Sequence, residues 1–320
     1  MELTPDFSVS VDGQFEIPKA RILSIRITDQ AGEISDSCSI ELDDFDNALR
    51  CPNTEAKISV FLGYKETGLT KMGTYYVHEI EISGARNKIS ITADALPKAM
   101  RSQKTRTNDM KLKEYLASIS SELGLGLSDE YGDIDLSGDA QVGESNMSYL
   151  TRLANRVGAV TKPVDNHLVF TENMSGKSAS GQNLPAKYID AFEVSSYSFV
   201  SKETEEQGAT GTVYATWYDR KKADYFVVQA GSGNPQTELK GYFSSEKEAL
   251  SAAQARIRRI EKNNKTLDFS LEGRPDLFSS GPIVLREFPT KIPTKWIISK
   301  VEHRLDHNGY ITRVWCVGGK

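Results

Sequence analysis

Apolar and polar residues alternate with a period of two through most of the first hundred residues. In RILSIRIT (residues 21–28), Leu23, Ile25 and Ile27 fall on one face. The segment DQAG then has turn chemistry, and SCSIELDD (residues 37–44) alternates again. AKISVFLGY, GTYYVHEIEISG and NKISITADA follow, each bounded by Gly or Asn. Several short strands with regular turns and no long helix predict a small antiparallel barrel or sandwich.

The pattern changes to helical spacing near Pro97. The apolar residues of KLKEYLASISSELG recur three and four positions apart, which predicts a helix that Gly124 can end. SNMSYLTRLANRVGA predicts a second helix, with Ser145 or Asn146 as N-cap and Gly158 after its last turn. HLVFTEN then reads as a strand. Residues 99–175 are therefore expected to form a small α+β insert domain.

A Gly- and Ser-rich connector, MSGKSASGQNLP, leads back to strand patterns. These occur in FEVSSYSFVSK, GATGTVYATWYD, KTLDFSLEG, PIVLREF, KWIISKVEHRLD and YITRVWCV, and the last two flank DHNG as a hairpin. One helix is predicted near 244–262, capped by Ser244 or Ser245. We therefore expect β domains at 1–98 and 176–320. No clear internal sequence repeat is present, although the two β segments could share a fold.

Composition and charge narrow the class of protein. The 320 residues suffice for two or three domains, no apolar run is long enough to span a bilayer, and the N-terminus lacks the pattern of a signal peptide. Cys38, Cys51 and Cys316 have no paired spacing, so we expect them to be reduced and structural in a reducing cytoplasm.

Acidic residues are concentrated in the first segment. The net charge is −5, from 39 Lys+Arg and 44 Asp+Glu. Residues 1–98 hold 10 basic and 16 acidic residues, a net of −6, so the remainder carries +1. This balance argues against general nucleic-acid binding.

Acidic and histidine residues supply the candidates for a metal site. Asp43, Asp44 and Asp46 lack the third ligand and the glycine of an EF-hand loop, so they are interpreted as a strand end and a turn. His303 and His307 lie on a strand and its turn, ~13 Å apart at ~3.3 Å per residue, too far for one ion. We expect both to be exposed. His78 and His167 have no Cys or His nearby in the sequence. No metal or cofactor is predicted.

One pair of carboxylates could serve an enzyme. A muralytic enzyme needs two carboxyl groups, and Glu144 could act with Asp133 or Asp135. Glu144 equally suits the dipole of the helix that follows it. No GxSxG, HExxH or P-loop pattern is present, and the basic ARIRRIEK reads as a solvated helix face. The residues by themselves indicate a soluble, β-rich structural or binding protein.

Six segments in one order carry a family resemblance over nearly the whole chain. They are RITDQAGEISDSCSIELDD, VFLGYKETGLTKMGTYYVHEIEISG, KAMRSQKTRTNDMKLKEYLASIS, GESNMSYLTRLANRVGA, FSSEKEALSAAQARIRRIEKNNKTLDFSLEGRPDL and KWIISKVEHRLDHNGYITRV. Together they resemble the phage late control protein D family, the tail hub proteins of contractile-tailed phages, which are similar to hubs of pyocins and of the N-terminal part of type VI spike proteins.

The resemblance implies a fold and an assembly. It implies two tube-like antiparallel β-barrel domains flanking the α+β insert, and a homotrimer whose six barrels form a pseudo-sixfold ring. Such a ring adapts a sixfold tail tube to a threefold spike and forms part of the channel. The implied partners are a separate central spike protein, the tail tube or tube initiator protein, the tape measure protein and other baseplate proteins.

The same resemblance implies where the protein works and what it does not do. It places the protein in the tail baseplate of the virion, assembled in the cytoplasm of the bacterial host, without enzymatic activity, sequence-specific nucleic-acid binding or a membrane span. In the ring, Asp43, Asp44 and Asp46 are expected to face or rim the channel, where negative charge repels DNA phosphates. Two alternatives stay open: a tail-associated peptidoglycan hydrolase built on the insert, and a glycan-binding protein that uses Trp217 and Tyr218.

Overall fold

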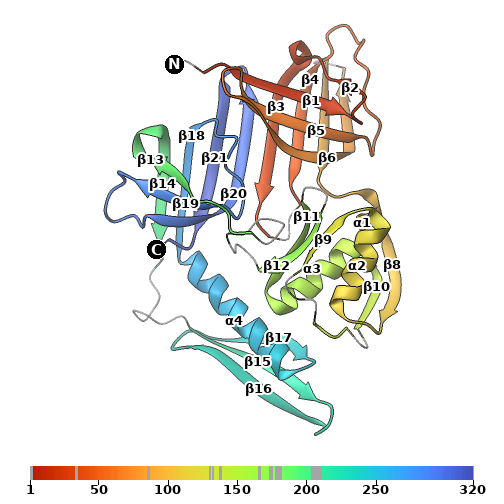
Figure 1. The fold of residues 1–320 in the computed structure, drawn as a ribbon, viewed down its shortest axis with the longest axis vertical. Helices are drawn as coiled ribbons and strands as arrows, with labels where there is room; N and C mark the ends of the chain where they lie inside the picture. The colour runs from red at the N-terminus through yellow and green to blue at the C-terminus, as the bar shows by residue number, and fades with distance from the viewer. Residues whose placement is uncertain are drawn as a thin grey trace.

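The computed structural model describes residues 3–32, 35–84, 87–129, 131, 133–136, 139–164, 167–172, 176, 182–202 and 211–319. Strands dominate the chain, as the alternation predicted, and four α-helices cover parts of the smaller sheets among these residues (Figure 1). Within the same ranges no helix combines the length and the hydrophobicity that crossing a membrane requires.

The first seven strands form the N-terminal β unit. Their bounds are β1 Pro5–Val11, β2 Phe15–Glu16, β3 Ile22–Gln30, β4 Ser37–Asp43, β5 Lys57–Tyr64, β6 Gly68–Ser83 and β7 Lys88–Asp94, with the 3-10 helix η1 at Lys19–Arg21. Alternate residues of each strand point into one apolar cluster that includes Ile25, Ile40, Ile58 and Ile91. The period of two therefore sets which face is buried.

Six later strands form the C-terminal β unit. Their bounds are β13 Lys187–Asp190, β14 Val194–Ser201, β18 Lys265–Glu272, β19 Pro282–Arg286, β20 Lys295–Asp306 and β21 Gly309–Val317, with the 3-10 helix η2 at Ala191–Glu193. This unit encloses an apolar cluster of its own, which includes Phe269, Trp296, Val301 and Val314. The predicted C-terminal hairpin is confirmed, since β20 and β21 pair from Asp306 and Gly309 onward.

The two β units join into one sheet of thirteen strands, because β3 pairs antiparallel with β20. β14 lies at one end of this sheet and the short β2 at the other. In Figure 1 the two units stand side by side, with β3 and β20 at their boundary.

The two β units repeat one topology. In the first unit the spatial order is β3-β4-β7-β6-β5-β1, and in the second it is β14-β18-β21-β20-β19-β13. Taken in chain order, each position is filled by the corresponding strand, and a 3-10 helix precedes both β3 and β14. All these pairs are antiparallel except β13 with β19, which is parallel whereas β1 with β5 is antiparallel.

Two β-bulges lie at matching places in the repeat. The ladder of β3 with β4 shifts after Ile22, and the ladder of β14 with β18 shifts after Val194. The ladder of β6 with β7 shifts after Val77, and that of β20 with β21 after Ile298. Because bulges are specific features of a ladder, this agreement indicates that the two units share one fold despite their different residues.

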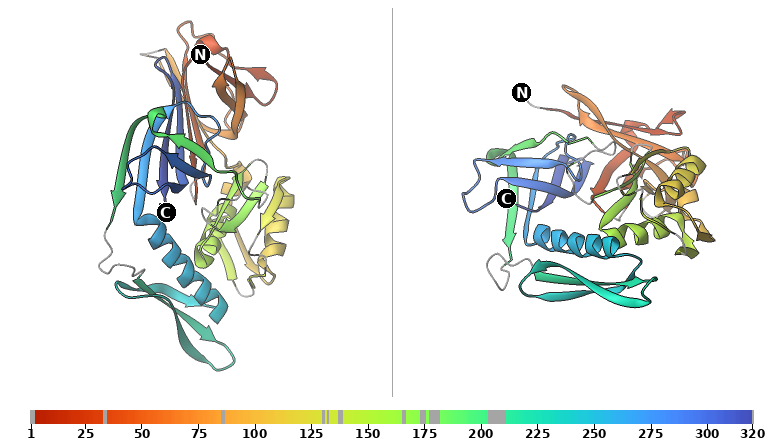
Figure 2. Two further views of the ribbon diagram at one scale, coloured as in Figure 1. Left: turned by 60° about the vertical axis from the view of Figure 1, so that its left-hand side comes forward. Right: turned by 60° about the horizontal axis from the view of Figure 1, so that its bottom comes forward.

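The insert unit lies between the two β units in sequence (Figure 2). Its elements are α1 Lys98–Arg101, β8 Gln103–Asn108, α2 Leu112–Leu123, β9 Gly126–Asp129, β10 Asp139–Ser145, α3 Asn146–Val157, β11 Ala159–Val164 and β12 His167–Glu172. The predicted caps are confirmed: Ser145 Oγ accepts from Ser148 N at 3.1 Å, and Gly124 and Gly158 end their helices in the left-handed region.

The predicted helix near 244–262 belongs to a larger unit, called here the α4 unit. It comprises β15 Gly211–Asp219, β16 Asp224–Ser232, β17 Gln236–Phe243 and α4 Glu246–Asn263. α4 packs Ala249, Ala253 and Ile257 against Val213 and Ala215 of β15, forming a separate apolar cluster. Within the described ranges, buried hydrophobic residues thus gather in four clusters, and the three-domain division of the chain stays a prediction.

Candidate functional site

The joint between β3 and β20 holds the two β units together. Seven residue pairs form it, from Gln30 opposite Lys300 to Ser24 opposite Asp306. Side chains cross the same boundary: Leu305 and Tyr310 of the C-terminal β unit pack into the apolar cluster of the N-terminal unit. The hydroxyl of Tyr64 donates to the carbonyl of Gly273 at 2.8 Å. The joint is therefore a packed interface as well as a ladder.

A buried ionic cluster lies at one end of this joint and ties in the insert unit. Lys162 Nζ on β11 donates to Asp36 Oδ1 at 2.9 Å and lies 3.3 Å from Asp29 Oδ1. Ser279 donates to Asp29 from its backbone N at 2.7 Å and from its hydroxyl at 2.5 Å. Only 12–16% of the Lys162, Asp29 and Asp36 side chains is exposed. The cluster thus joins the insert unit through Lys162, the N-terminal β unit through Asp29, and the C-terminal β unit through Ser279.

The charges of this cluster are unequal. Burial, reinforced by the charge of Asp29, raises the pKa of Asp36 to about 7. Burial also opposes ionisation of Asp29, but Lys162 and the hydrogen bonds from Ser279 outweigh it and lower the pKa of Asp29. The two carboxylates likewise outweigh burial and raise the pKa of Lys162. Near neutral pH the ammonium therefore has one fully ionised partner and one that is partly protonated.

The prediction that His303 is exposed is wrong. Its side chain is fully buried, and its ring nitrogens lie 3.1 Å from Thr312 Oγ1 and 3.1 Å from the carbonyl oxygen of Leu277. The Tyr310 hydroxyl lies 2.9 Å from Nδ1. His303 alternates with the apolar Val301 and Leu305 along β20, so it belongs to the inner face. His307, in the following turn, is exposed as predicted.

The acids at the end of β4 act locally on the turn that follows. Asp43 Oδ1 accepts from Phe45 N at 3.1 Å, Asp44 Oδ1 accepts from Leu49 N at 2.9 Å, and Asp46 Oδ1 accepts from Ala48 N at 3.3 Å. Asp46 also pairs with Arg21, whose hydrogen bond lowers the pKa of Asp46. Asp44 is buried, whereas Asp46 is exposed. The interpretation of a strand end and a turn fits these contacts.

Two of the three carboxylates considered for hydrolysis, Glu144 and Asp133, lie beside cationic side chains. Glu144 on β10 accepts from Arg152 at 2.8 Å. Asp133 is almost fully exposed and lies 3.6 Å from Lys111. Asp135 forms a β-bridge with Lys111. A glycosidase acid sits in an apolar pocket, and the surroundings of Glu144 differ from that requirement.

The aromatic residues considered for glycan binding lie on opposite faces of the α4 unit's sheet. Trp217 packs into the apolar cluster under α4 and stacks on Phe226, with ring centroids 5.3 Å apart. Tyr218 contacts Tyr225, which contacts Tyr242, with centroids 4.9 and 4.7 Å apart. Because Trp217 and Tyr218 alternate along β15, they do not form one stacking surface.

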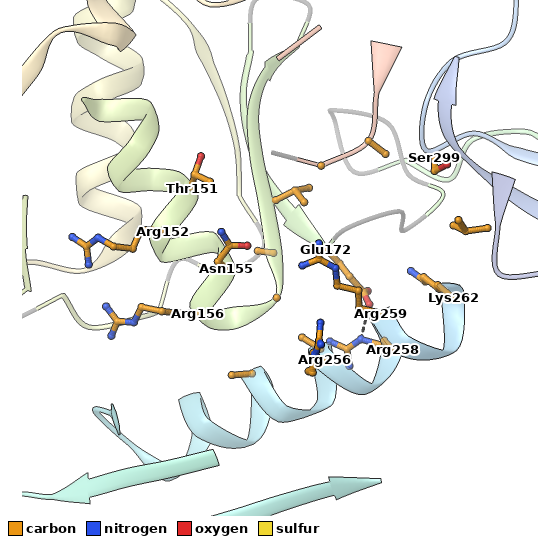
Figure 3. Close-up of a pocket in the computed structure, with 18 of the residues that line it drawn as sticks. Thr151, Arg152, Asn155, Arg156, Glu172, Arg256, Arg258, Arg259, Lys262 and Ser299 are labelled. Atoms are coloured by element: carbon orange, nitrogen blue, oxygen red, sulfur yellow. Dashed lines mark ion pairs between the residues drawn. The ribbon is translucent and has the colours of Figure 1, made fainter. Parts of the chain in front are cut away.

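A cavity of about 970 Å³ lies between α3, α4 and the ends of β20 and β21 (Figure 3). Glu172 is the one acidic residue among the described residues that line it, whereas eight are basic: Arg152, Arg156, Lys240, Arg256, Arg258, Arg259, Lys262 and Lys300. Glu172 pairs with Arg258 at 3.1 Å, and Arg156 pairs with Glu248 at 2.7 Å. Arg256 and Arg259 are exposed, as predicted for ARIRRIEK, although the same helix also borders this cavity.

Metal-ligating residues do not cluster in the described ranges, where no group of three His, Cys, Asp or Glu side chains could hold an ion. His78 lies 3.5 Å from Asp94. Cys38 and Cys316 are buried and Cys51 is half-buried, all three as free thiols. Burial raises the pKa of the Cys38 thiol to about 12, so it is an inert apolar side chain.

Comparisons with known proteins agree with this architecture. The chain is 25% identical over 340 residues to the probable baseplate hub protein of Escherichia phage 186, covering 91% of this chain and 87% of that protein. It is 24% identical over 359 residues to the probable baseplate hub protein of Escherichia phage P2, covering 97% and 92%. The structure of a tail protein from Neisseria meningitidis MC58 shares the fold, with a TM-score of 0.70, 13% identity, and coverage of 98% and 96%.

The model of one protein family matches residues 111–309, which is well over half of the chain. The match spans α2 and α3 of the insert unit, the α4 unit and β20. This family places the protein in the tail of a phage particle. The chain belongs to the phage tail baseplate hub (GPD) family.

Proposed function

We propose that the protein is the central hub of a contractile tail baseplate, in which three copies close into a ring of six similar β units. The observation that carries the proposal is the repeat of one strand order in the two β units of each chain. Closed rings need a heterologous, head-to-tail contact that repeats around an axis. Three chains with two equivalent units each supply six such positions.

A ring of this kind would match two symmetries at once. Its six β units would offer six similar positions to a sixfold tail tube or tube initiator protein. The insert unit and the α4 unit occur once per chain, so they would mark every second position and give threefold features. A threefold central spike protein fits that face of the ring. The tape measure protein and other baseplate proteins are the further partners in this proposal.

The channel proposal concerns the turn after β4. Asp43 and Asp46 are accessible to solvent there, whereas Asp44 is buried against the amide of Leu49. In the ring, we place the two accessible carboxylates at the wall or rim of the channel, in the unit that holds the acidic excess of the chain. Negative charge at that place would keep DNA phosphates from binding during passage.

Electron microscopy of the purified protein tests the ring. End-on averages should show a closed ring with six similar densities and true threefold symmetry, because alternate densities carry the insert unit. A three-dimensional reconstruction would also place the turn after β4. Discrete particles without a ring would contradict the hub arrangement, and a ring with Asp43 and Asp46 on its outer wall would contradict the channel role alone.

A further inference from the structure

The sheet has two open edges that correspond to the two sides of the β3–β20 joint. β14 pairs with β18 and, within the described residues, with no second strand. β6 pairs with β5 through 68–76 and with β7 through 76–83, and Val77 still bonds to Glu55 and Ala56, so residues 78–83 keep one edge without a described partner. The repeat relates these edges to the joint. β14 is the counterpart, in the C-terminal β unit, of β3. The open part of β6 is the counterpart, in the N-terminal β unit, of the segment of β20 that pairs with β3.

Open edges with apolar side chains need a cover. Ile82 at the edge of β6 is 67% exposed, and Tyr197 and Val200 on β14 are 47% and 45% exposed. Their counterparts inside the chain are covered: His303 occupies the place of Ile82, Ile25 occupies that of Tyr197, and both are fully buried. Ile82 and Tyr197 thus lie where the first joint buries its inner face, whereas Val200 corresponds to the half-buried Thr28 on the other face.

We infer that β14 of one copy pairs antiparallel with residues 79–83 of β6 in the next copy, repeating between molecules the joint that β3 and β20 form within one. The inference rests on the ring proposed above and specifies how its copies meet. The two edges lie on opposite sides of the molecule, β14 on the left and β6 on the right in Figure 1. That placement suits a head-to-tail contact.

The matching bulges fix the register. Val194 corresponds to Ile22, an offset of 194 − 22 = 172, and Ile298 corresponds to Val77, an offset of 298 − 77 = 221. Adding 172 to the β3 residue and subtracting 221 from the β20 residue converts each pair of the joint, such as Thr28 with Glu302 or Ile27 with His303, into a pair between copies. The resulting pairs are Lys202 with Glu79, Ser201 with Ile80, Val200 with Glu81, Phe199 with Ile82 and Ser198 with Ser83.

This register is chemically consistent. It places Phe199 opposite Ile82, so that the exposed isoleucine meets an aromatic ring already packed against the C-terminal cluster. It places the exposed Lys202 opposite the exposed Glu79. Neither residue has an ion pair with another described side chain. Aromatic–aliphatic and opposite-charge pairs both stabilise neighbouring strands.

Cysteine crosslinking tests the register directly. Directly opposed residues of an antiparallel pair have Cα atoms ~4.5–5.5 Å apart, within the reach of a disulfide, whereas diagonal neighbours are too distant. With Val200→Cys and Glu81→Cys on one chain, oxidation should link three chains into one covalent species on a denaturing gel. Val200→Cys with Glu79→Cys is the matched control and should yield little of it. The wild-type chain, with its three native cysteines, gives the background.

A second variant tests the edge by assembly. Ile82→Asp places a charge at the predicted inner face of the joint and should convert the trimer to monomers by light scattering. Val142→Asp, at a 69% exposed position of β10, should leave the trimer intact. A trimer of Ile82→Asp, or a wild-type trimer whose Val200–Glu81 cysteine pair fails to crosslink, would overturn the joint and leave the ring standing. A monomeric wild type would overturn the ring, and the joint with it.

Discussion

Replacing Lys162 with methionine should destabilise the protein by about 3–5 kcal/mol, the usual result of removing one partner of a buried ion pair. Methionine keeps a similar length without the charge, so Asp29 would remain ionised in a nearly closed site. Loss of the lysine also removes the contact between β11 and the turn from β3 to β4. The measurement is chemical unfolding followed by tryptophan fluorescence, which reports on Trp296 and Trp315 in the C-terminal β unit.

Two variants serve as controls for Lys162. Lys240→Met removes an exposed lysine and should change the free energy of unfolding by less than about 0.5 kcal/mol. Asp36→Asn should cost less than Asp29→Asn at neutral pH, because the Asp36 carboxyl, with its pKa raised to about 7, is already partly neutral there. Equal unfolding midpoints for Lys162→Met and Lys240→Met would show that the cluster does not hold the units together.

Protonation of His303 should lower the free energy of unfolding by about 3 kcal/mol between pH 6.5 and pH 4. Burial lowers its pKa from 6.5 to about 4, against a weaker opposing effect of the Leu277 carbonyl, and that difference corresponds to about 3 kcal/mol. In the unfolded chain the His303 imidazole binds a proton near pH 6.5, whereas in the native protein it does so only near pH 4. The stabilisation is therefore complete above pH 6.5 and is lost as the pH falls to about 4.

The His303 effect is isolated by comparing variants across pH. The raised pKa of Asp36 gives the opposite slope in the same range, since the native carboxyl binds its proton first. The contribution of Asp36 cancels when the free energy of unfolding of His303→Gln is subtracted from that of the wild type. This difference should shrink by about 3 kcal/mol between pH 6.5 and 4. His307→Gln, on the same hairpin but exposed, should follow the wild type. Parallel curves for His303→Gln and wild type would contradict this role.

Local chemistry made the helices predictable from the sequence. Ser145 and Ser245 were both among the expected N-caps, and each accepts a hydrogen bond from the backbone three residues on. Gly124 and Gly158 end their helices because only glycine enters the left-handed region at little cost. These signals lie within a few residues of the feature that they specify.

Features that depend on distant contacts were missed. The alternation of His303 with Val301 and Leu305 carried the signal for burial, but the polar ring and the nearby turn favoured exposure. Nothing around Lys162 in AVTKPV marks it as buried, because its partners lie more than 120 residues away. The strands β16 and β17 were also missed, since most of their residues are exposed and the apolar residues of DYFVVQAGS are consecutive rather than alternating with polar ones.

The repeat of the two β units could not be recognised from residue identity. Corresponding inner positions hold Ile25 and Tyr197, or Ile82 and His303, which differ in size and polarity. What the units share is strand order and the place of two bulges, and both emerge only when the ladders are paired. The fold constrains which face is buried far more than which side chain occupies it.

The mass of the purified protein in solution tests the central claim most directly. Light scattering on a size-exclusion column should give about three times 35.5 kDa, because each chain supplies two of six β units and leaves β14 and part of β6 open for pairing. The species should persist on dilution to micromolar concentration, as obligate interfaces do. A stable monomer of about 35.5 kDa would contradict a hub that closes by pairing its own edges.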